Sequence, residues 1–204
     1  MDLKSTYNRI AQDWDADHKN DDWWIEGLGA FVSLLHPGAT VLDVGCGSGV
    51  KSEVLIKKGL RVTGMDFSEN LLAIAKRRLP EEKFLLVDLY DLSNLNEKFD
   101  AIFAQAVLLH IPKKDVRKII HSLKEKLIPG GYFYVAVKEQ REGEKEEELV
   151  RESDYGYEYE RFFSYFNLKE ITQFFLDERM KIVYESVAHS GRRNWIQIIG
   201  KSKD

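Results

Sequence analysis

The sequence predicts an α/β fold with a mostly parallel sheet of seven strands, helices on both faces and an antiparallel hairpin at its C-terminal end. Three observations support this prediction. An apolar, β-favouring segment at residues 41–44 runs directly into three alternating glycines within residues 45–49, which is typical of a buried parallel strand followed by a tight turn. From residue 40 onward, strand-like and helix-like patterns alternate as in βαβ units. Two β-rich runs, 181–188 and 194–199, are separated only by residues 189–193, too few for a crossover helix.

The elements can be assigned in order along the chain. Residues 7–35 precede the first strand, contain several aromatic side chains and predict one or two helices. The strands expected in the parallel part of the sheet lie near residues 40–45, 61–65, 83–87, 99–104 and 131–138. Helices near 48–58, 68–78 and 113–127 connect them. The last of these helices starts after Pro112, and a Pro129-Gly130-Gly131 turn precedes the fifth strand.

Composition restricts the class of protein. With 204 residues, of which 44% are hydrophobic and 31% charged, the chain fits one globular domain over residues 1–204. No apolar run approaches the ~20 residues that span a bilayer, and residues 1–6 lack the apolar core of a signal peptide. Cys46 is the only cysteine, which excludes an internal disulfide and a cysteine-ligated metal cluster and favours a cytoplasmic location. The net charge of −4 argues against a nucleic-acid partner. We also expect no membrane partner, and the sequence does not specify an oligomeric state.

The glycine-rich turn is the first candidate binding element. Gly45, Gly47 and Gly49 allow positive φ angles and leave no Cβ beside a ligand. The turn stands at a strand end, where open α/β sheets bind nucleotide-like ligands. A dinucleotide fingerprint would require its third glycine at position 50, where this chain has Val50. Asp43 instead supplies a carboxylate suited to a cationic, zwitterionic ligand.

Acidic residues follow the next two strands. Asp66 lies 21 positions after Gly45 (66 − 45), the distance at which a βα unit returns to the neighbouring strand end. A carboxylate there accepts hydrogen bonds from both hydroxyls of a ribose; the alternative is that Asp66 caps the helix that begins near Ser68. Asp88 follows the third strand, where the alternative is a surface turn. An acid at the position of Asp66 also occurs in NAD enzymes, so this residue alone does not identify the ligand.

Several segments resemble the class I S-adenosylmethionine-dependent methyltransferases, which have a Rossmann-like fold. Residues 41–49 look like motif I of that family, an acid followed by alternating glycines, and residues 99–112 look like its motif IV with a leucine-histidine-hydrophobic-proline ending. Residues 127–133 resemble its Leu-x-Pro-Gly-Gly turn, and residues 7–14 resemble a helix of its small-molecule methyltransferases. The resemblance covers nearly the whole chain. It implies a three-layer Rossmann-like fold, S-adenosylmethionine (SAM) as cofactor, and a small molecule whose oxygen, nitrogen or sulfur atom accepts the methyl group.

The resemblance also implies which residues bind the cofactor. They are Tyr7, Trp14, Asp43, Gly45, Cys46, Gly47, Gly49, Asp66, Phe67, Ser68, Asp88, Leu89 and Gln105. The glycine-rich turn and Asp43 would surround the methionine portion, Asp66 would hold the ribose, and Asp88 with the adjacent backbone amide would hold the adenine. The two aromatic residues, seven positions apart on one helical face, would shield the cofactor from water. The alternative is a plain amphipathic helix packed on the sheet.

Three residues are candidates for the acceptor side. His110 lies in the segment that passes beside the transferable methyl group in the family, and it would act as a base. The alternative is a structural histidine at a strand-to-helix corner. Arg161 and Tyr159 belong to an aromatic cluster that would line the acceptor pocket, with core packing as the alternative. The Glu-rich residues 139–154 that precede this cluster are expected to be solvated or disordered.

Two segments stand apart from the repeated pattern: residues 1–36 would form an N-terminal helical cap and residues 139–166 an acidic and aromatic insertion. Enzymes that methylate exocyclic base amines have an Asn- or Asp-Pro-Pro-aromatic tetrad at the position of residues 105–108, and this chain lacks it. Enzymes that methylate pyrimidine carbon need a catalytic cysteine after this strand, and none is present. No carboxylate cluster indicates a catalytic metal ion. Two alternatives stay open: an NAD(P)-dependent oxidoreductase, and a module that binds SAM or a partner protein without catalysis.

Overall fold

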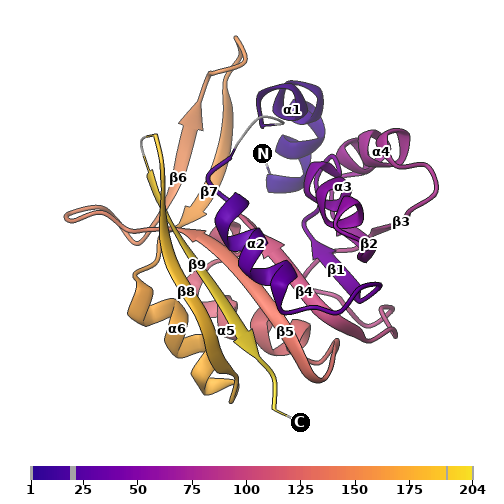
Figure 1. Cartoon of the computed structure of the whole chain (residues 1–204). Coiled ribbons are helices and arrows are strands. Elements are labelled where there is room, and N and C mark those ends of the chain that lie inside the picture. The colour runs from indigo at the N-terminus through magenta and orange to yellow at the C-terminus, as the bar shows by residue number, and fades with distance from the viewer. Residues whose placement is uncertain (1, 19–21, 192, 204) are drawn as a thin grey trace.

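The computed structural model describes residues 2–18, 22–191 and 193–203, and its centre is a seven-stranded sheet (Figure 1). Residues 1 and 19–21 of the expected cap, and residue 192 of the hairpin connection, lie outside the described residues. The strands follow the spatial order β3-β2-β1-β4-β5-β9-β8. Their bounds are β1 Thr40–Val44, β2 Arg61–Asp66, β3 Lys83–Leu86, β4 Phe99–Gln105, β5 Leu127–Lys138, β8 Lys181–Ser190 and β9 Arg193–Lys201. β9 runs antiparallel to β5 and β8, whereas the other pairs are parallel. The predicted mixed sheet with a C-terminal hairpin is confirmed.

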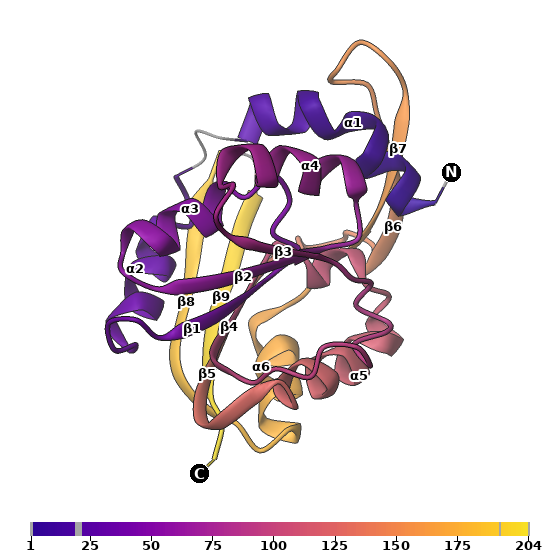
Figure 2. The same ribbon diagram turned by 90° about the vertical axis from the view of Figure 1, so that its right-hand side faces the viewer.

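Helices cover both faces of this sheet (Figure 2). Their bounds are α1 Leu3–His18, α2 Ile25–Ser33, α3 Val50–Lys57, α4 Glu69–Arg78, α5 Lys113–Lys124 and α6 Leu168–Asp177, with a short 3-10 helix η1 at Leu108–His110. α5 and α6 pack on one face, in a core that contains Leu42 and Val44 of β1. α2 and α3 pack on the opposite face, in a second core that contains Val41. β1 is therefore buried on both sides, which explains its continuous apolar sequence.

The sequence of α5 explains how one face is closed. Val116, Ile119, Ile120 and Leu123 recur with the spacing of a single helical stripe, and each is at most 1% exposed. Burying an aliphatic side chain of this size contributes roughly 1.5–3 kcal/mol relative to leaving it in water. The stripe therefore fixes α5 on the sheet and holds the parallel strand ends in register.

Two boundaries differ from those expected by three or four residues, and one further helix was not expected. α5 ends at Lys124 rather than near residue 127, because Leu127 already pairs with Phe99 in the ladder between β4 and β5. β5 consequently begins four residues before the expected position 131 (131 − 127). α6 has no counterpart among the expected elements, although Asn167 caps its first turn by accepting a hydrogen bond from Glu170 N.

The Glu-rich segment is more ordered than expected. Residues Glu147–Glu152 form β6, which pairs antiparallel with β7 (Tyr159–Ser164) in a separate two-stranded sheet beside α1. The segment was expected to be solvated or disordered; alternate residues of β6 are exposed to solvent, but β6 is not disordered, because two ion pairs connect it to β7. Arg161 of β7 forms an ion pair with Glu152 at 2.6 Å, and Arg151 forms one with Glu160 at 3.2 Å.

Candidate active site

A cavity of about 840 Å³ lies at the carboxyl ends of the parallel strands. Its lining combines strand ends, α1 and β7, which contribute, among others, Asp43 of β1, Asp66 of β2, Gln105 of β4, Lys138 of β5, Tyr7 of α1 and Phe163 of β7. A cavity of this size lies within the range of small-molecule and cofactor sites.

Most of the residues expected from the sequence line this one cavity. They are Tyr7, Trp14, Asp43, Gly45, Cys46, Gly47, Asp66, Phe67, Asp88, Leu89, Gln105, His110 and Arg161. Gly49, Ser68 and Tyr159 are not part of the lining. Segments far apart in the sequence thus converge on the edge of the sheet where they were expected.

The three residues outside the lining have structural contacts instead. Gly49 precedes α3 with φ +80°, and a Cβ there would lie 3.2 Å from the Cβ of Ala75, so it permits close packing of α3 on α4. Ser68 is the N-cap of α4 and accepts a hydrogen bond from Leu71 N. Tyr159 is 3% exposed and stacks on Tyr155 at 5.4 Å between ring centroids, which favours the core-packing alternative for this residue.

The glycine-rich turn and Asp66 form one hydrogen-bonded unit. Gly47 N donates to one carboxylate oxygen of Asp66 at 2.9 Å, and Ser68 N donates to the other at 2.8 Å. Gly45 and Gly47 have φ angles of +63° and +54°, which L side chains rarely adopt. A Cβ on Gly47 would lie 3.2 Å from the ring of Trp14. The turn therefore needs glycine both for its backbone conformation and for its distance to α1.

Asp43 places a second buried carboxylate beside the first. It is 2% exposed and accepts a hydrogen bond from Ser52 Oγ at 2.6 Å. Burial raises the pKa of Asp43 to about 7 and the pKa of Asp66 to about 6. Two carboxyl groups that resist ionisation in this environment favour a ligand that brings positive charge.

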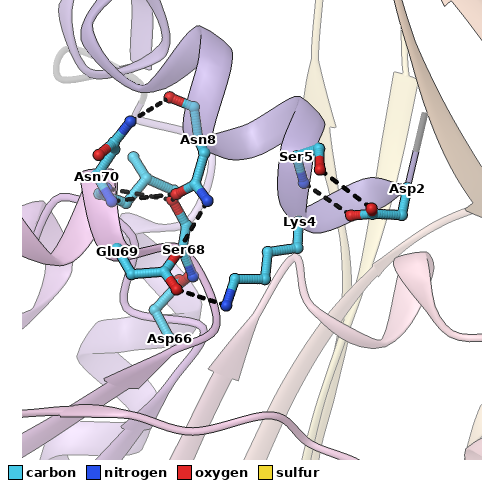
Figure 3. Close-up of polar contacts among 9 residues, drawn as sticks. Asp2, Lys4, Ser5, Asn8, Asp66, Ser68, Glu69 and Asn70 are labelled. Atoms are coloured by element: carbon cyan, nitrogen blue, oxygen red, sulfur yellow. Dashed lines mark hydrogen bonds and ion pairs between the residues drawn. The ribbon is translucent and has the colours of Figure 1, made fainter.

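A polar cluster attaches α1 to the start of α4 (Figure 3). Asn8 Oδ1 accepts hydrogen bonds from Ser68 Oγ at 2.7 Å and from Asn70 N at 3.1 Å, while Asn8 Nδ2 donates to Glu69 at 2.8 Å. Lys4 forms an ion pair with Glu69 at 2.5 Å. Because Ser68 N also binds the Asp66 carboxylate, the cluster connects α1 to the wall of the cavity.

His110 lies between two fixed partners. Its Nδ1 is 2.7 Å from the carbonyl oxygen of Phe162, which only accepts, so Nδ1 bears the proton. Nε2 then accepts the hydrogen bond from the hydroxyl of Tyr7, also at 2.7 Å. Burial lowers the pKa of His110 to about 3. Because both ring nitrogens are occupied, this geometry favours the structural alternative over the role of a base.

Comparison with known proteins identifies the family. Residues 42–135 match a family model described as a methyltransferase domain. Over 142 residues the chain is 32% identical to a ubiquinone biosynthesis O-methyltransferase from Hydrogenovibrio crunogenus, an alignment that covers 64% of this chain and 57% of that protein. Over 110 residues it is 36% identical to a trans-aconitate 2-methyltransferase from Variovorax paradoxus, which covers 53% of this chain and 42% of that protein. Residues 42–135 are thus those of a methyltransferase domain, and the chain has the class I, Rossmann-like methyltransferase fold. It spans about half the length of these curated relatives.

Solved structures of methyltransferases share the fold. A 1,6-didemethyltoxoflavin-N1-methyltransferase from Burkholderia thailandensis aligns with a TM-score of 0.79 and 18% identity over 99% of this chain and 88% of that chain. A SAM-dependent methyltransferase from Methanosarcina mazei aligns with a TM-score of 0.76 and 23% identity over 85% of this chain and 97% of that chain. At these identities the likeness shows the fold alone. The match of residues 42–135 to a methyltransferase domain sets aside the NAD(P)-dependent oxidoreductase alternative.

The methyltransferase cavity also has lining residues that the sequence patterns missed. They are Lys138 at the end of β5 and Arg193 and Trp195 at the start of β9. These strand ends are adjacent because β9 of the C-terminal hairpin pairs with β5. The one available signal was Lys138 itself, a cation that directly follows the buried apolar residues 133–137. The role of Asn8 in attaching α1 to α4 was also missed, although Asn8 is the neighbour of Tyr7 on the predicted N-terminal helix. Across the described residues, no helix is both long and apolar enough to cross a membrane.

Proposed function

We propose that this chain transfers the methyl group of SAM to an oxygen, nitrogen or sulfur atom of a small molecule. The observation that supports the proposal most strongly is the single cavity at the strand ends, which contains most of the residues that the family resemblance implies for cofactor binding. Asp43 and the glycine-rich turn would hold the methionine portion. Asp66 would hold the ribose, and Asp88 with Leu89 would hold the adenine.

The residues present fit such a ligand. Each carboxylate oxygen of Asp66 accepts one backbone hydrogen bond, and each has a further lone pair for a ribose hydroxyl. Gln105 Oε1 and Ser48 Oγ line the cavity, are buried and have no hydrogen-bond partner among the described residues. Unpaired buried polar atoms are costly, so a ligand with donor groups at these positions would remove the penalty.

The chemistry requires little from the protein beyond binding and orientation. Bound SAM supplies an electrophilic methyl group on a sulfonium, which is a good leaving group. Tyr7 and Trp14, whose rings meet edge to face at 6.4 Å between centroids, would exclude water from the reacting atoms. The strand ends and α1 would hold the acceptor close to the methyl group and in line with it. This proximity and orientation would provide most of the acceleration of methyl transfer. His110 would position Tyr7 through its Nε2 rather than remove a proton.

We also propose that residues 1–204 work as one domain, in which the N-terminal cap (1–36) and the insertion (139–166) together complete the cavity. Thr6 Oγ1 of the cap donates to the carbonyl oxygen of Glu160 in the insertion at 3.0 Å, which supports this arrangement. Because Cys46 is the only cysteine, we propose a cytoplasmic location, where a free thiol is kept reduced.

The test is a methyl-transfer assay. Purified protein is incubated with methyl-labelled SAM and small-molecule extracts, and the label is followed into the extract. The proposal is supported if the wild type transfers the label and Asp66→Asn does not. Asp177→Asn, on the surface of α6, is the matched control and should keep full activity. A wild-type protein that binds SAM tightly and transfers no label to any extract would instead be a non-catalytic binding module.

A further inference from the structure

The cavity has a positively charged part that the cofactor assignment does not use. We call it the basic end and define it by Lys138, Arg161, Arg193, Phe163 and Trp195, all of which line the cavity. The Lys138 ammonium lies 3.7 Å from the centroid of the Phe163 ring and 6.0 Å from that of Trp195. The guanidinium of Arg161 lies 5.2 Å from the centroid of the Phe163 ring. These side chains therefore form one cluster.

The two arginines of the basic end are already neutralised. Arg161 donates to both carboxylate oxygens of Glu152, each at 2.6 Å. Arg193 donates to both carboxylate oxygens of Glu144, at 2.6 and 2.8 Å. Such two-point pairs are the geometry in which arginine and carboxylate bind most strongly. Neither glutamate is therefore available as a close partner for Lys138.

Lys138 is the charge that stays unmatched. In residues 2–18, 22–191 and 193–203, its ammonium makes contacts with aromatic rings and neither a hydrogen bond nor an ion pair. Burial, together with the positive charges of Arg161 and Arg193, lowers its pKa to about 8. The two arginines and their two glutamates cancel, so the basic end has a net charge of one, located on Lys138. A partly desolvated cation without a partner attracts an anion.

Its position relates Lys138 to the reacting atoms. Ala136 of β5 pairs with Gln105 of β4, and Lys138 lies two residues further along β5, on the same face and at the same strand end. Phe163, which the lysine contacts, is in turn 4.9 Å from His110 between ring centroids. By the family resemblance, residues 105–110 would pass beside the methyl group of bound SAM. An acceptor held by Lys138 would therefore lie next to that segment.

We infer that the methyl acceptor carries an anionic oxygen group, a carboxylate or a phosphoryl group, that pairs with Lys138 while its body contacts Phe163 and Trp195. Trp195 stacks on Trp23 at 3.9 Å between centroids, so its ring is held as a rigid flat wall, and a planar or apolar acceptor body fits against it. This inference rests on the proposed methyl transfer and narrows its substrate class.

The experiment separates the acceptors by charge before the reaction. A small-molecule extract is divided on ion exchangers into anionic, neutral and cationic pools, and each pool is incubated with methyl-labelled SAM and wild-type protein. Carboxylates and phosphoryl compounds within the anionic pool are then distinguished by phosphatase treatment and by mass spectrometry of the labelled product. We expect transfer only into molecules from the anionic pool.

Variants of Lys138 then test the residue itself. Lys138→Gln should raise the KM for the active acceptor by about 10- to 100-fold, as expected for loss of a charge-assisted contact, with the affinity for S-adenosylhomocysteine unchanged. Lys138→Arg should restore most of the wild-type KM. Lys181→Gln, at the opposite end of the sheet where β8 begins, is the matched control and should behave as wild type. Unchanged affinity for S-adenosylhomocysteine also shows that the variant is folded.

The outcomes are distinguishable. Transfer confined to the neutral or cationic pool would overturn the inference and leave the proposed methyl transfer intact. Transfer into no pool would overturn both. A Lys138→Gln variant whose kcat collapses at unchanged KM would also overturn the inference, because the residue would then act in the chemical step rather than in binding an anion.

Discussion

Replacing Asp43 by asparagine should stabilise the ligand-free protein and weaken its binding of SAM. The wild-type carboxyl group is 2% exposed, and burial raises its pKa from 3.8 to about 7. At about 1.4 kcal/mol for each pKa unit, this difference corresponds to roughly 4 kcal/mol of strain in the ionised state. Asparagine keeps an oxygen to accept the hydrogen bond of Ser52 Oγ and removes the charge, but its amide group also needs partners. We therefore expect a gain of roughly 1–3 kcal/mol, or a rise in Tm of about 2–10 °C for a chain of this size.

The pH dependence of this gain follows from the direction of the pKa shift. A carboxyl group with a raised pKa contributes its full stability below the unfolded value of 3.8 and loses it as the pH rises through about 7. The stability difference between Asp43→Asn and the wild type should therefore grow between about pH 4 and pH 7 and stay constant above. Denaturant unfolding at several pH values measures it, with Asp177→Asn, an exposed carboxylate on α6, as control.

The same variant should bind the cofactor less tightly. Loss of a buried negative charge facing a cationic ligand should raise the Kd for SAM by about 10- to 100-fold. Calorimetry with wild type and variant gives this ratio. A variant that is less stable than the wild type at pH 8, or that binds SAM with unchanged affinity, would refute the assignment of Asp43 as a strained carboxylate that interacts with the ligand.

Three further changes test other parts of the cavity. Gly47→Val should leave a folded protein that no longer binds S-adenosylhomocysteine, because the side chain is strained at φ +54° and meets Trp14; normal affinity in calorimetry would contradict this. Asn8→Ala should increase hydrogen exchange across α1 and weaken cofactor binding several-fold, since it removes the side-chain contacts of Asn8 to α4; exchange identical to wild type would show that these contacts do not hold α1 in place. His110→Phe should lower the free energy of unfolding by about 2–4 kcal/mol, because the Tyr7 hydroxyl and a backbone carbonyl lose their partner. The pH dependence of kcat near pH 6.5 should be the same in His110→Phe as in the wild type, since the pKa of His110 is about 3; a titration there that disappears in the variant would restore the role of a base.

Local sequence patterns were sufficient for the parallel core of the fold. Each strand from β1 to β5 is an apolar run followed by a turn or helix signal, so order and direction follow from short-range information. The hairpin of β8 and β9 was also predictable, because residues 189–193 are too few for any other connection. β6 was not predictable, since its charged side chains favour solvent until Glu160 and Arg161 of β7 are placed beside Arg151 and Glu152.

The cofactor side of the cavity was more predictable than the acceptor side, because it depends on local sequence patterns rather than on how separate segments pair. Asp43, Gly47 and Asp66 lie at or just after the carboxyl ends of strands in the continuous parallel sheet, so their convergence depends only on strand order. Lys138 and Arg193 meet because β9 inserts next to β5, and their unequal pairing depends on how the glutamates of the insertion (139–166) fold back onto the arginines. Sequence spacing contains no information on which of several cations is left without a partner.

Whether the cavity binds the cofactor is decided by calorimetric titration of S-adenosylhomocysteine into wild-type protein, Asp66→Asn and Asp177→Asn. Asp66 is the residue to change because it connects the glycine-rich turn, the start of α4 and the proposed ribose. We expect binding of one ligand per wild-type chain, a Kd raised by about 10- to 100-fold in Asp66→Asn, and an unchanged Kd in Asp177→Asn. Absence of binding to the wild type, or affinities for Asp66→Asn within threefold of the wild type, would contradict this expectation.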